Sequence, residues 1–219
     1  MIKTFEGIVI RQTRIMGGQR MILVFTREEG KISAGTHLSE KSKSGAALAI
    51  RPFAYGQYHM TEKSRDVRKI SSAEAIDAHY ALGEDADRFA DASYILEFTD
   101  KVLPEGIPAP GIFELLKEYL DLLAARKNDF RLLTISYMIK VMQELGVFPD
   151  SDSLKFGELL SDLNDDILDV LTFIETQPLK RMETLTLDGE KESAIFVLIK
   201  EFAQKYLDLG SIKSERLFA

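Results

Sequence analysis

The sequence predicts an α+β protein in which a small five-stranded barrel, residues 1–78, precedes an all-α region, residues 79–219. Short β-rich segments separated by turn residues fill the first 76 positions. After residue 77 the apolar residues recur at helical spacing instead. The charge divides near the same place, since residues 1–70 carry 13 Lys and Arg against 6 Asp and Glu, and residues 71–219 carry 15 against 29.

Five segments of the first region have the composition and length of strands. They are residues 2–11, 21–25, 31–37, 52–60 and 66–72. The run 21–25 is apolar throughout and too short for a helix, which is typical of a strand covered on both faces. Gly17-Gly18 predicts the turn before it. We expect these strands to close into a barrel, because closure removes their exposed edges.

Five helices are expected in the second region. They cover residues 89–103, 113–123, 130–145, 164–174 and 188–209. The third helix should end at Gly146, with Pro149 beyond it, and Asn164 and Asp188 are suitable N-caps for the last two. No long linker separates the two regions, so we expect them to pack against each other.

Composition limits the possible classes of protein. The chain has 219 residues, of which 45% are hydrophobic, enough for each of two modest domains to bury a core. No run approaches the roughly 18 apolar residues of a membrane span, and no signal-like segment opens the chain. The chain has no cysteine, which excludes disulfides, thiol nucleophiles and thiolate metal sites. We expect a cytoplasmic protein without a membrane partner.

Motifs for catalysis are missing from the sequence. His37, His59 and His79 have no neighbour at metal-ligand spacing, and we expect them at the surface or at strand ends. Gly17-Gly18 suits a hairpin turn better than a phosphate-binding loop. The acidic residues of 162–169 are typical of helix caps and a solvated face. We therefore expect no enzyme, no metal and no cofactor.

The basic residues of the first region are the better functional candidates, because residues 1–70 have a net charge of +7. Flexible Lys and Arg side chains on the loops of a small barrel can follow a phosphate backbone without reading its sequence. A merely solvated basic surface is the alternative, and charge alone does not separate the two. Phe53, Tyr55 and Tyr58 follow the basic loop and offer rings for base stacking, although a tyrosine on a strand commonly packs half-buried.

Several segments resemble the RecO family of bacterial recombination mediators. They are Glu6-Gly7-Ile8-Val9-Ile10, Phe25-Thr26-Arg27-Glu28-Glu29-Gly30-Lys31, Lys41-Ser42-Lys43-Ser44-Gly45 with Arg51-Pro52-Phe53, Ala92-Ser93-Tyr94-Ile95-Leu96-Glu97, and Leu145-Gly146-Val147-Phe148-Pro149. None is specific alone, but their order and spacing along nearly the whole chain are. The resemblance implies that the barrel is an OB-fold and that the second region is helical.

The resemblance also implies a function and partners. Such proteins bind single- and double-stranded DNA, anneal complementary strands, bind the acidic C-terminal tail of single-strand binding protein, and work with RecR to load RecA. The implied DNA-binding residues are Lys41 and Lys43 first, then Arg14, Arg20, Arg27 and Arg51. The implied tail-binding residues are Lys140, with Arg131 and Arg126 as companions. An exposed helix lysine without a ligand is the alternative for Lys140.

The chain also departs from the family pattern. Many relatives carry four cysteines after the Leu-Gly-aromatic-Pro segment, forming a zinc finger, whereas residues 150–190 here contain none. We expect zinc to be absent and this part to be shortened or rebuilt as helix. The turn near Gly17 lacks acidic residues that the resemblance leads us to expect. The helical region is strongly acidic, which favours a basic protein partner over a share of the DNA surface.

Two other readings stay open at the level of sequence. One is a protein–protein adaptor whose barrel binds a peptide and whose basic surface is incidental. The other is an RNA-binding barrel protein. A steep fall of DNA affinity with salt would favour the DNA-binding mediator, because each neutralised phosphate contributes a slope of about −0.7 for single strands. Salt-insensitive peptide binding would favour the adaptor.

Overall fold

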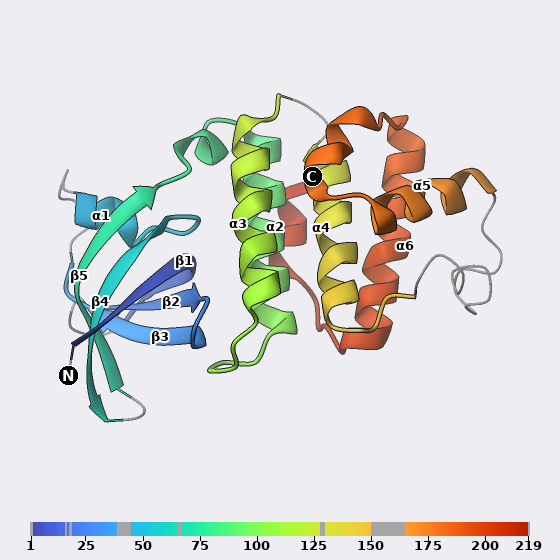
Figure 1. Ribbon diagram of the computed structural model, residues 1–219. Helices are drawn as coiled ribbons and strands as arrows, with labels where there is room; N and C mark the ends of the chain where they lie inside the picture. The colour runs from blue at the N-terminus through green and yellow to red at the C-terminus, as the bar shows by residue number, and fades with distance from the viewer. Residues whose placement is uncertain are drawn as a thin grey trace.

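A computed structural model describes residues 2–15, 17, 19–38, 45–64, 67–127, 130–149 and 165–218. Figure 1 shows a β-barrel at one end and a group of helices at the other, with α2 and α3 between the barrel and the remaining helices.

Five strands form the barrel, in the order β1-β2-β3-β5-β4 with β4 closing back on β1. Their bounds are β1 Ile2–Arg14, β2 Arg20–Thr26, β3 Gly30–Thr36, β4 Tyr55–Ser64 and β5 Val67–Asp77. All neighbouring strands are antiparallel except β3 and β5, which are parallel. This is the arrangement of an OB-fold. The predicted α+β class, a five-stranded OB-type barrel followed by helices, is confirmed.

The long strand β1 closes the barrel because it pairs with two partners. Residues 2–8 pair with β4, and residues 7–14 pair with β2. Gly7 lies opposite Gly56, and a Cβ at Gly56 would lie 2.3 Å from the carbonyl oxygen of Glu74. A side chain at this position would therefore force the β4–β5 pair apart.

The two faces of β1 and β2 belong to different cores. Val9, Ile22 and Val24 pack inside the barrel, whereas Leu23 and Phe25 pack against the helices. Successive residues of a strand point to opposite faces, so an unbroken apolar run supplies both cores at once. The prediction that 21–25 is a strand covered on both faces is confirmed.

A short helix, α1 (Gly45–Ala49), lies between β3 and β4, where no helix was expected from the sequence. Its buried Ala49 and the following Ile50 pack into the barrel interior, which explains why so short a segment is held as a helix. Lys41 and Lys43, which precede it, lie outside the described residues.

Five longer helices follow the barrel, as predicted. They are α2 Ala86–Val102, α3 Pro110–Ala125, α4 Phe130–Glu144, α5 Asp165–Thr176 and α6 Gly189–Leu207. Three single-turn segments, η2 Tyr80–Gly83, η4 Leu179–Thr184 and η5 Lys213–Phe218, complete the described elements. Asp188 caps α6 by accepting from the Lys191 amide at 2.8 Å, as predicted, whereas Asn164 lies outside the described residues.

Helix α4 forms the centre of the helical region. Residues 132–139 are all buried, because other helices surround α4. In the parts of the chain that the structure describes, no helix combines the length and the apolar character needed to span a membrane.

Candidate nucleic-acid interface

The hairpin end of the barrel brings two of the predicted DNA-binding residues together. Arg14 ends β1, Arg20 begins β2, and the two are paired directly across the strands. Side chains of opposed residues lie on the same face of a sheet. Arg14 is exposed and Arg20 half-buried, and neither is without an interaction partner. In OB-folds the loop between the first two strands commonly contacts oligonucleotides.

The second loop that OB-folds use lies between β4 and β5, and basic residues follow it as well. Arg68 on β5 forms ion pairs with Glu29 at 2.6 Å and with Glu62 at 3.7 Å. Partial burial alone would raise the pKa of the Glu29 carboxyl, but hydrogen bonds and charge from Arg68 and Lys3 outweigh it and lower the pKa. Arg68 is therefore held against the barrel by its own acidic neighbours. Arg65 lies outside the described residues.

Arg27, another predicted DNA-binding residue, lies between the barrel and α3. Its guanidinium forms an ion pair with Glu114 and lies 5.8 Å from the centre of the Phe113 ring. Arg27 directly follows β2, two residues after Phe25, which packs against the helices. Its charge therefore joins the two regions of the protein and is already paired.

Arg51 precedes β4 and is exposed. Together with Arg11 it lines a cavity of about 930 Å³ between the barrel and α2. Arg11 lies 3.6 Å from the carboxylate of Asp100 on α2. The guanidinium of Arg51 has no hydrogen-bond or ion-pair partner within the described part of the chain.

The suggestion that Tyr55 and Tyr58 stack on bases is wrong, because both side chains are buried. Tyr58 is fully buried inside the barrel, and its hydroxyl donates to the carbonyl of Ala49 at 2.7 Å. Tyr55 faces the helices, and its hydroxyl donates to Glu6. The alternative, packing on the strand, is the one observed. Burial also raises the pKa of the Tyr58 phenol well above its usual range.

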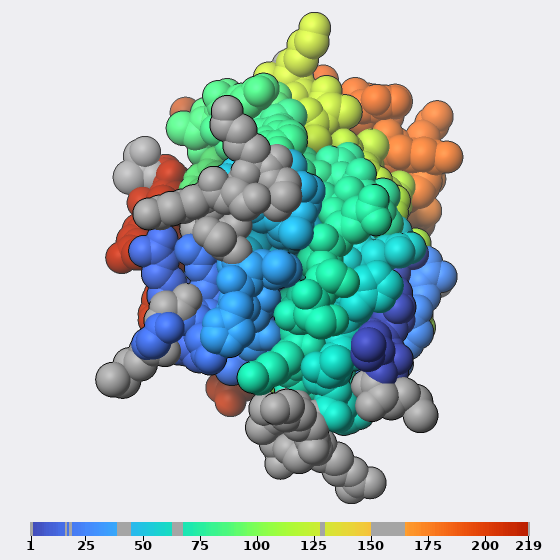
Figure 2. All heavy atoms as spheres, turned by 90° about the vertical axis from the view of Figure 1, so that its left-hand side faces the viewer, coloured from blue at the N-terminus to red at the C-terminus, as the bar shows by residue number. Residues whose placement is uncertain are grey.

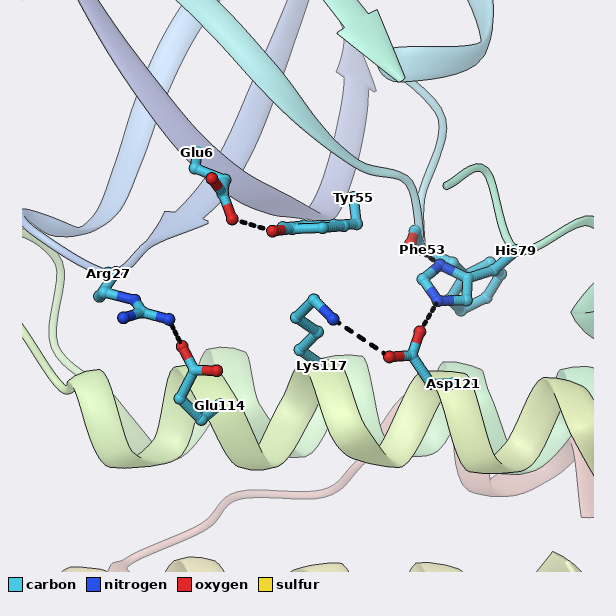
Figure 3. A network of polar contacts seen from close by, with 8 residues as sticks. All are labelled: Glu6, Arg27, Phe53, Tyr55, His79, Glu114, Lys117 and Asp121. Atoms are coloured by element: carbon cyan, nitrogen blue, oxygen red, sulfur yellow. Dashed lines mark hydrogen bonds and ion pairs between the residues drawn. The ribbon is translucent and has the colours of Figure 1, made fainter. Parts of the chain in front are cut away.

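A polar network joins the barrel to α3 (Figure 3). The Nδ1 atom of His79 lies 2.9 Å from the carbonyl oxygen of Phe53, and its Nε2 atom lies 2.9 Å from Asp121 on α3. Through its two ring nitrogens His79 thus bridges the segment before β4 and α3. His79 is buried and was not expected there, and the sequence does not reveal a partner 42 residues away.

The same residues are the nearest approach to a metal-binding arrangement in the described residues. One ligand atom each from Asp77, His79 and Asp121 lies within 4.8 Å of the others. Their atoms are already used, since Asp77 accepts from the His79 amide at 2.7 Å and Asp121 accepts from Lys117 at 3.2 Å. The arrangement therefore serves as a hydrogen-bonded link between barrel and helix.

Two of the predicted tail-binding cations make structural contacts inside the helical region. The ammonium of Lys140 donates to the carbonyl of Glu175 at 2.5 Å, near the end of α5, and burial lowers the pKa of Lys140. Arg131 donates to the buried Asp91 at 3.0 Å and lies 3.7 Å from the centre of the Phe218 ring. Lys140 is thus not the freely exposed helix lysine of the alternative reading.

Arg126, the third predicted tail-binding residue, ends α3 and is half-buried. Its carbonyl accepts from Arg88 at 2.6 Å, and its side chain is not without a partner. Nothing in the described contacts brings Arg126, Arg131 and Lys140 to one cavity.

Figure 2 shows the barrel side of the molecule, with the barrel segments in the centre and helical segments around the rim. Arg14 and Arg20 belong to β1 and β2, and Arg51 lies just before β4. Other cations of the barrel meet carboxylates of the helical region, as Arg27 meets Glu114 and Lys31 meets Asp100.

A closed five-stranded barrel with this strand order and a helical region behind it defines the class of OB-fold proteins with a helical extension. Two family models match the chain, "Recombination protein O N terminal" over residues 1–79 and "Recombination protein O C terminal" over residues 83–154. The chain belongs to the recombination protein O (RecO) family, as its sequence indicated.

Curated relatives are similar over the same part of the chain. The chain is 29% identical over 149 residues to "DNA repair protein RecO" of Alkaliphilus metalliredigens, a match covering 68% of this chain and 60% of the relative. It is 31% identical over 153 residues to the protein of that name from a Thermoanaerobacter species, covering 70% and 61%. The chain thus spans about three fifths of the length of these relatives.

Proposed function

We propose that this protein acts in recombinational DNA repair as a DNA-binding mediator. It binds single- and double-stranded DNA, anneals complementary strands, and helps RecR to load RecA on DNA coated by single-strand binding protein. The observation that carries this proposal is the paired Arg14 and Arg20 at the hairpin end of an OB barrel in a RecO-family chain. The names of the relatives support the role in repair.

The mechanism that we propose is physical and needs no bond to be broken. Arginine side chains neutralise backbone phosphates and release counterions, which lowers the repulsion between two strands. A protein that also holds the binding protein's tail would bring coated DNA to this surface. No nucleotide hydrolysis is required, so we propose that the chain is not an enzyme and works without a cofactor.

The contacts of the barrel rank the predicted DNA-binding residues. Arg14, Arg20 and Arg51 come first, because they lie at the hairpin end or on the rim of a cavity. Arg27 comes after them, because Glu114 already pairs with its charge. Lys41 and Lys43 remain predictions, since they lie outside the described residues.

The proposed hold on the acidic tail of single-strand binding protein belongs to the helical region. Lys140 and Arg131 keep structural partners there, so a tail would have to share these cations with Glu175 and Asp91. The acidic character of the region also suits a basic partner protein. We propose a cytoplasmic, nucleoid-associated location, which follows from a DNA-bound role.

The first experiment is a salt titration of binding to a fluorescent single-stranded oligonucleotide. The variant R14A/R20A should bind more weakly, and its slope of log affinity against log salt should be shallower by about 1.4 than that of the unchanged protein. The matched control is K180A/R181A, which removes two exposed cations from η4 in the helical region and should leave the slope unchanged.

The outcomes separate the open readings. Binding that is absent even at low salt would contradict the mediator and favour the adaptor, which needs partners to reach DNA. If both double variants lose the same DNA affinity, the affinity depends on the overall charge of the protein and not on the hairpin end of the barrel. Tighter binding to RNA than to DNA of the same sequence would favour the RNA-binding reading.

A further inference from the structure

The cavity between the barrel and α2 has features that the proposed surface at the hairpin end lacks. Its volume of about 930 Å³ is within the range of about 300–1,000 Å³ typical of sites for small organic ligands. One wall comes from β1 and the turn before β4, and the other from α2 and the segment that leads into it. Neither region forms the cavity alone.

Three aromatic side chains line this cavity: Phe53, Tyr80 and Phe89. Tyr80 is 58% exposed and Phe89 is 41% exposed, so both rings are open to a ligand. Phe53 meets Phe89 edge to face with ring centres 5.7 Å apart, which fixes the orientation of the Phe89 ring. Aromatic rings held open in a cavity offer stacking surfaces to any flat ligand.

A polar group in the same wall has no partner. The side-chain Nε2 of Gln12 is buried, and it has no hydrogen-bond partner among the residues that the structure describes. Leaving a buried amide donor unpaired costs free energy. A ligand that places an acceptor atom against Gln12 would recover that free energy.

The lining of the cavity carries a net positive charge, because four cations, Arg11, Arg51, Lys101 and Lys213, stand against two carboxylates, Glu97 and Asp100. Glu97 accepts from the amides of Lys213 and Ser214, each at 2.8 Å. Asp100 accepts from the buried Lys31 at 2.6 Å. The exposed side chains of Arg51, Lys101 and Lys213 then supply cations at three separate points of the lining.

We propose that this cavity receives one unpaired nucleotide of single-stranded DNA. The base lies against Phe89 and Tyr80 and accepts from Gln12, while the neighbouring phosphates meet Arg51, Lys101 and Lys213. Separate cations suit a chain of repeated charges, whereas a peptide end carries one carboxylate. The inference rests on the proposed DNA-binding function. It adds a site in the protein where one base leaves the stack of its neighbours and enters the cavity.

The test compares an oligomer of thymidine with an abasic oligomer of the same length and backbone. The unchanged protein should prefer thymidine by about tenfold, which corresponds to about 1.4 kcal/mol for one stacked base. The variants F89A and Y80A should lose most of this preference while keeping their affinity for the abasic oligomer. R51A should weaken binding to both oligomers equally, because it removes a phosphate contact.

The matched control is Y206A, which removes an aromatic ring 46% exposed on α6, far along the chain from the cavity. It should keep the full preference for thymidine. Unfolding midpoints in urea establish that each variant is folded. A 5-iododeoxyuridine oligomer, activated by light, should form crosslinks to peptides that contain Tyr80 or Phe89, which mass spectrometry identifies.

Failure of this inference differs from failure of the proposed function. If the protein binds both oligomers equally and F89A changes neither affinity, the cavity does not receive a base, while DNA binding stands. If neither oligomer binds at low salt, the proposed function fails. If a peptide with a C-terminal aromatic residue abolishes the crosslinks but leaves DNA affinity unchanged, the cavity belongs to a protein partner and the inference is overturned.

Discussion

The contact between the barrel and the helices is built differently from the contacts among the helices. At its centre the barrel contact has an edge-to-face pair, Phe25 and Phe113, with ring centres 5.6 Å apart. Three polar pairs also cross this contact: Arg27 with Glu114, Lys31 with Asp100, and His79 with Asp121. In each pair one residue comes from the barrel or the segment just after it, and its partner comes from a helix.

Among the helices, the buried polar groups are mostly hydroxyls. Tyr119 meets Thr134 at 2.8 Å, and Thr99 meets Tyr137 at 2.8 Å, each between two helices. Neutral pairs of this kind are satisfied at little desolvation cost. The comparison teaches that the helices are joined by packing, whereas the barrel is oriented by charge pairs around a small apolar centre. The cavity of about 930 Å³ lies at the barrel contact.

The largest expected effect comes from removing the apolar centre of the barrel contact. We expect F25A to lower the free energy of unfolding by about 3–5 kcal/mol, because it leaves a cavity against Phe113. Circular dichroism in urea measures strand and helix signals separately. Because both cores share β2, the two signals should shift together. V24A, which opens a smaller hole inside the barrel, is the control, and separate transitions in F25A would show two independent units.

The second prediction concerns the ion pair between Arg131 and the buried Asp91. R131M should lower the free energy of unfolding by about 3 kcal/mol at neutral pH, since Asp91 is then buried without its cation. Burial already raises the pKa of Asp91, against the opposing effect of Arg131.

The pH dependence of this loss has a definite sign. The penalty belongs to the ionised Asp91 and is therefore present above its raised pKa and relieved as the pH falls through it. Urea midpoints of R131M and of D91N/R131M should thus differ at pH 7 and converge in acid. Equal midpoints at pH 7 would mean that Asp91 has found another partner. Tests of tail binding with Arg131 variants need this stability measurement first.

The third prediction concerns the contact between His79 and Asp121 at the barrel–helix interface. D121A should lower the free energy of unfolding by about 2 kcal/mol, because it leaves a buried nitrogen of His79 without an acceptor. D121N should lose less, since its amide still offers an oxygen. K117A is the control, because an exposed i,i+4 pair contributes only about 0.3–0.5 kcal/mol. If D121A were as mild as K117A, His79 would not depend on this contact.

The smallest effect is expected where η5 joins α2. Partial burial alone would raise the pKa of Glu97, but hydrogen bonds from Lys213 and Ser214 outweigh it and lower the pKa. This contribution to stability is present above the ordinary glutamate pKa and is lost as the pH falls through the lowered one. E97Q should therefore lose about 1 kcal/mol at pH 7, and this loss should shrink as the pH falls through the lowered pKa. A constant difference across that fall in pH, by urea titration, would contradict it.

Local pattern was enough to predict most elements of the fold. The five strands and five helices follow from periodicity and turn residues, and the two-sided burial of 21–25 follows from its unbroken apolar run. The helix α1 was missed because five residues carry too little periodicity, and its burial depends on the barrel around it. Asp85 and Asp188 each cap a helix by accepting from an amide three residues later in the chain, and the cap at Asp188 was predicted.

The site was less predictable, because its geometry depends on contacts between distant segments. Arg27 has the sequence features of a DNA-binding residue, and only the position of Glu114, 87 residues later, reveals its pairing. Tyr55 alternates like an exposed strand residue, but the helices cover that face of the barrel. Phe89 begins the helix expected over residues 89–103, and no pattern in the sequence shows that it borders a cavity with Phe53.

The apolar outer face of β1 and β2 has a consequence for how the protein is made. Leu23 and Phe25 leave the ribosome well before the segment of α3 that covers them. At about 5–20 residues per second, roughly 5–20 s separate the synthesis of Phe25 from that of Phe113. Throughout that interval the newly made barrel exposes an apolar surface patch. Chaperone capture of the nascent chain, or aggregation of any fragment that stops before α3, is the cost of sharing one strand between two cores.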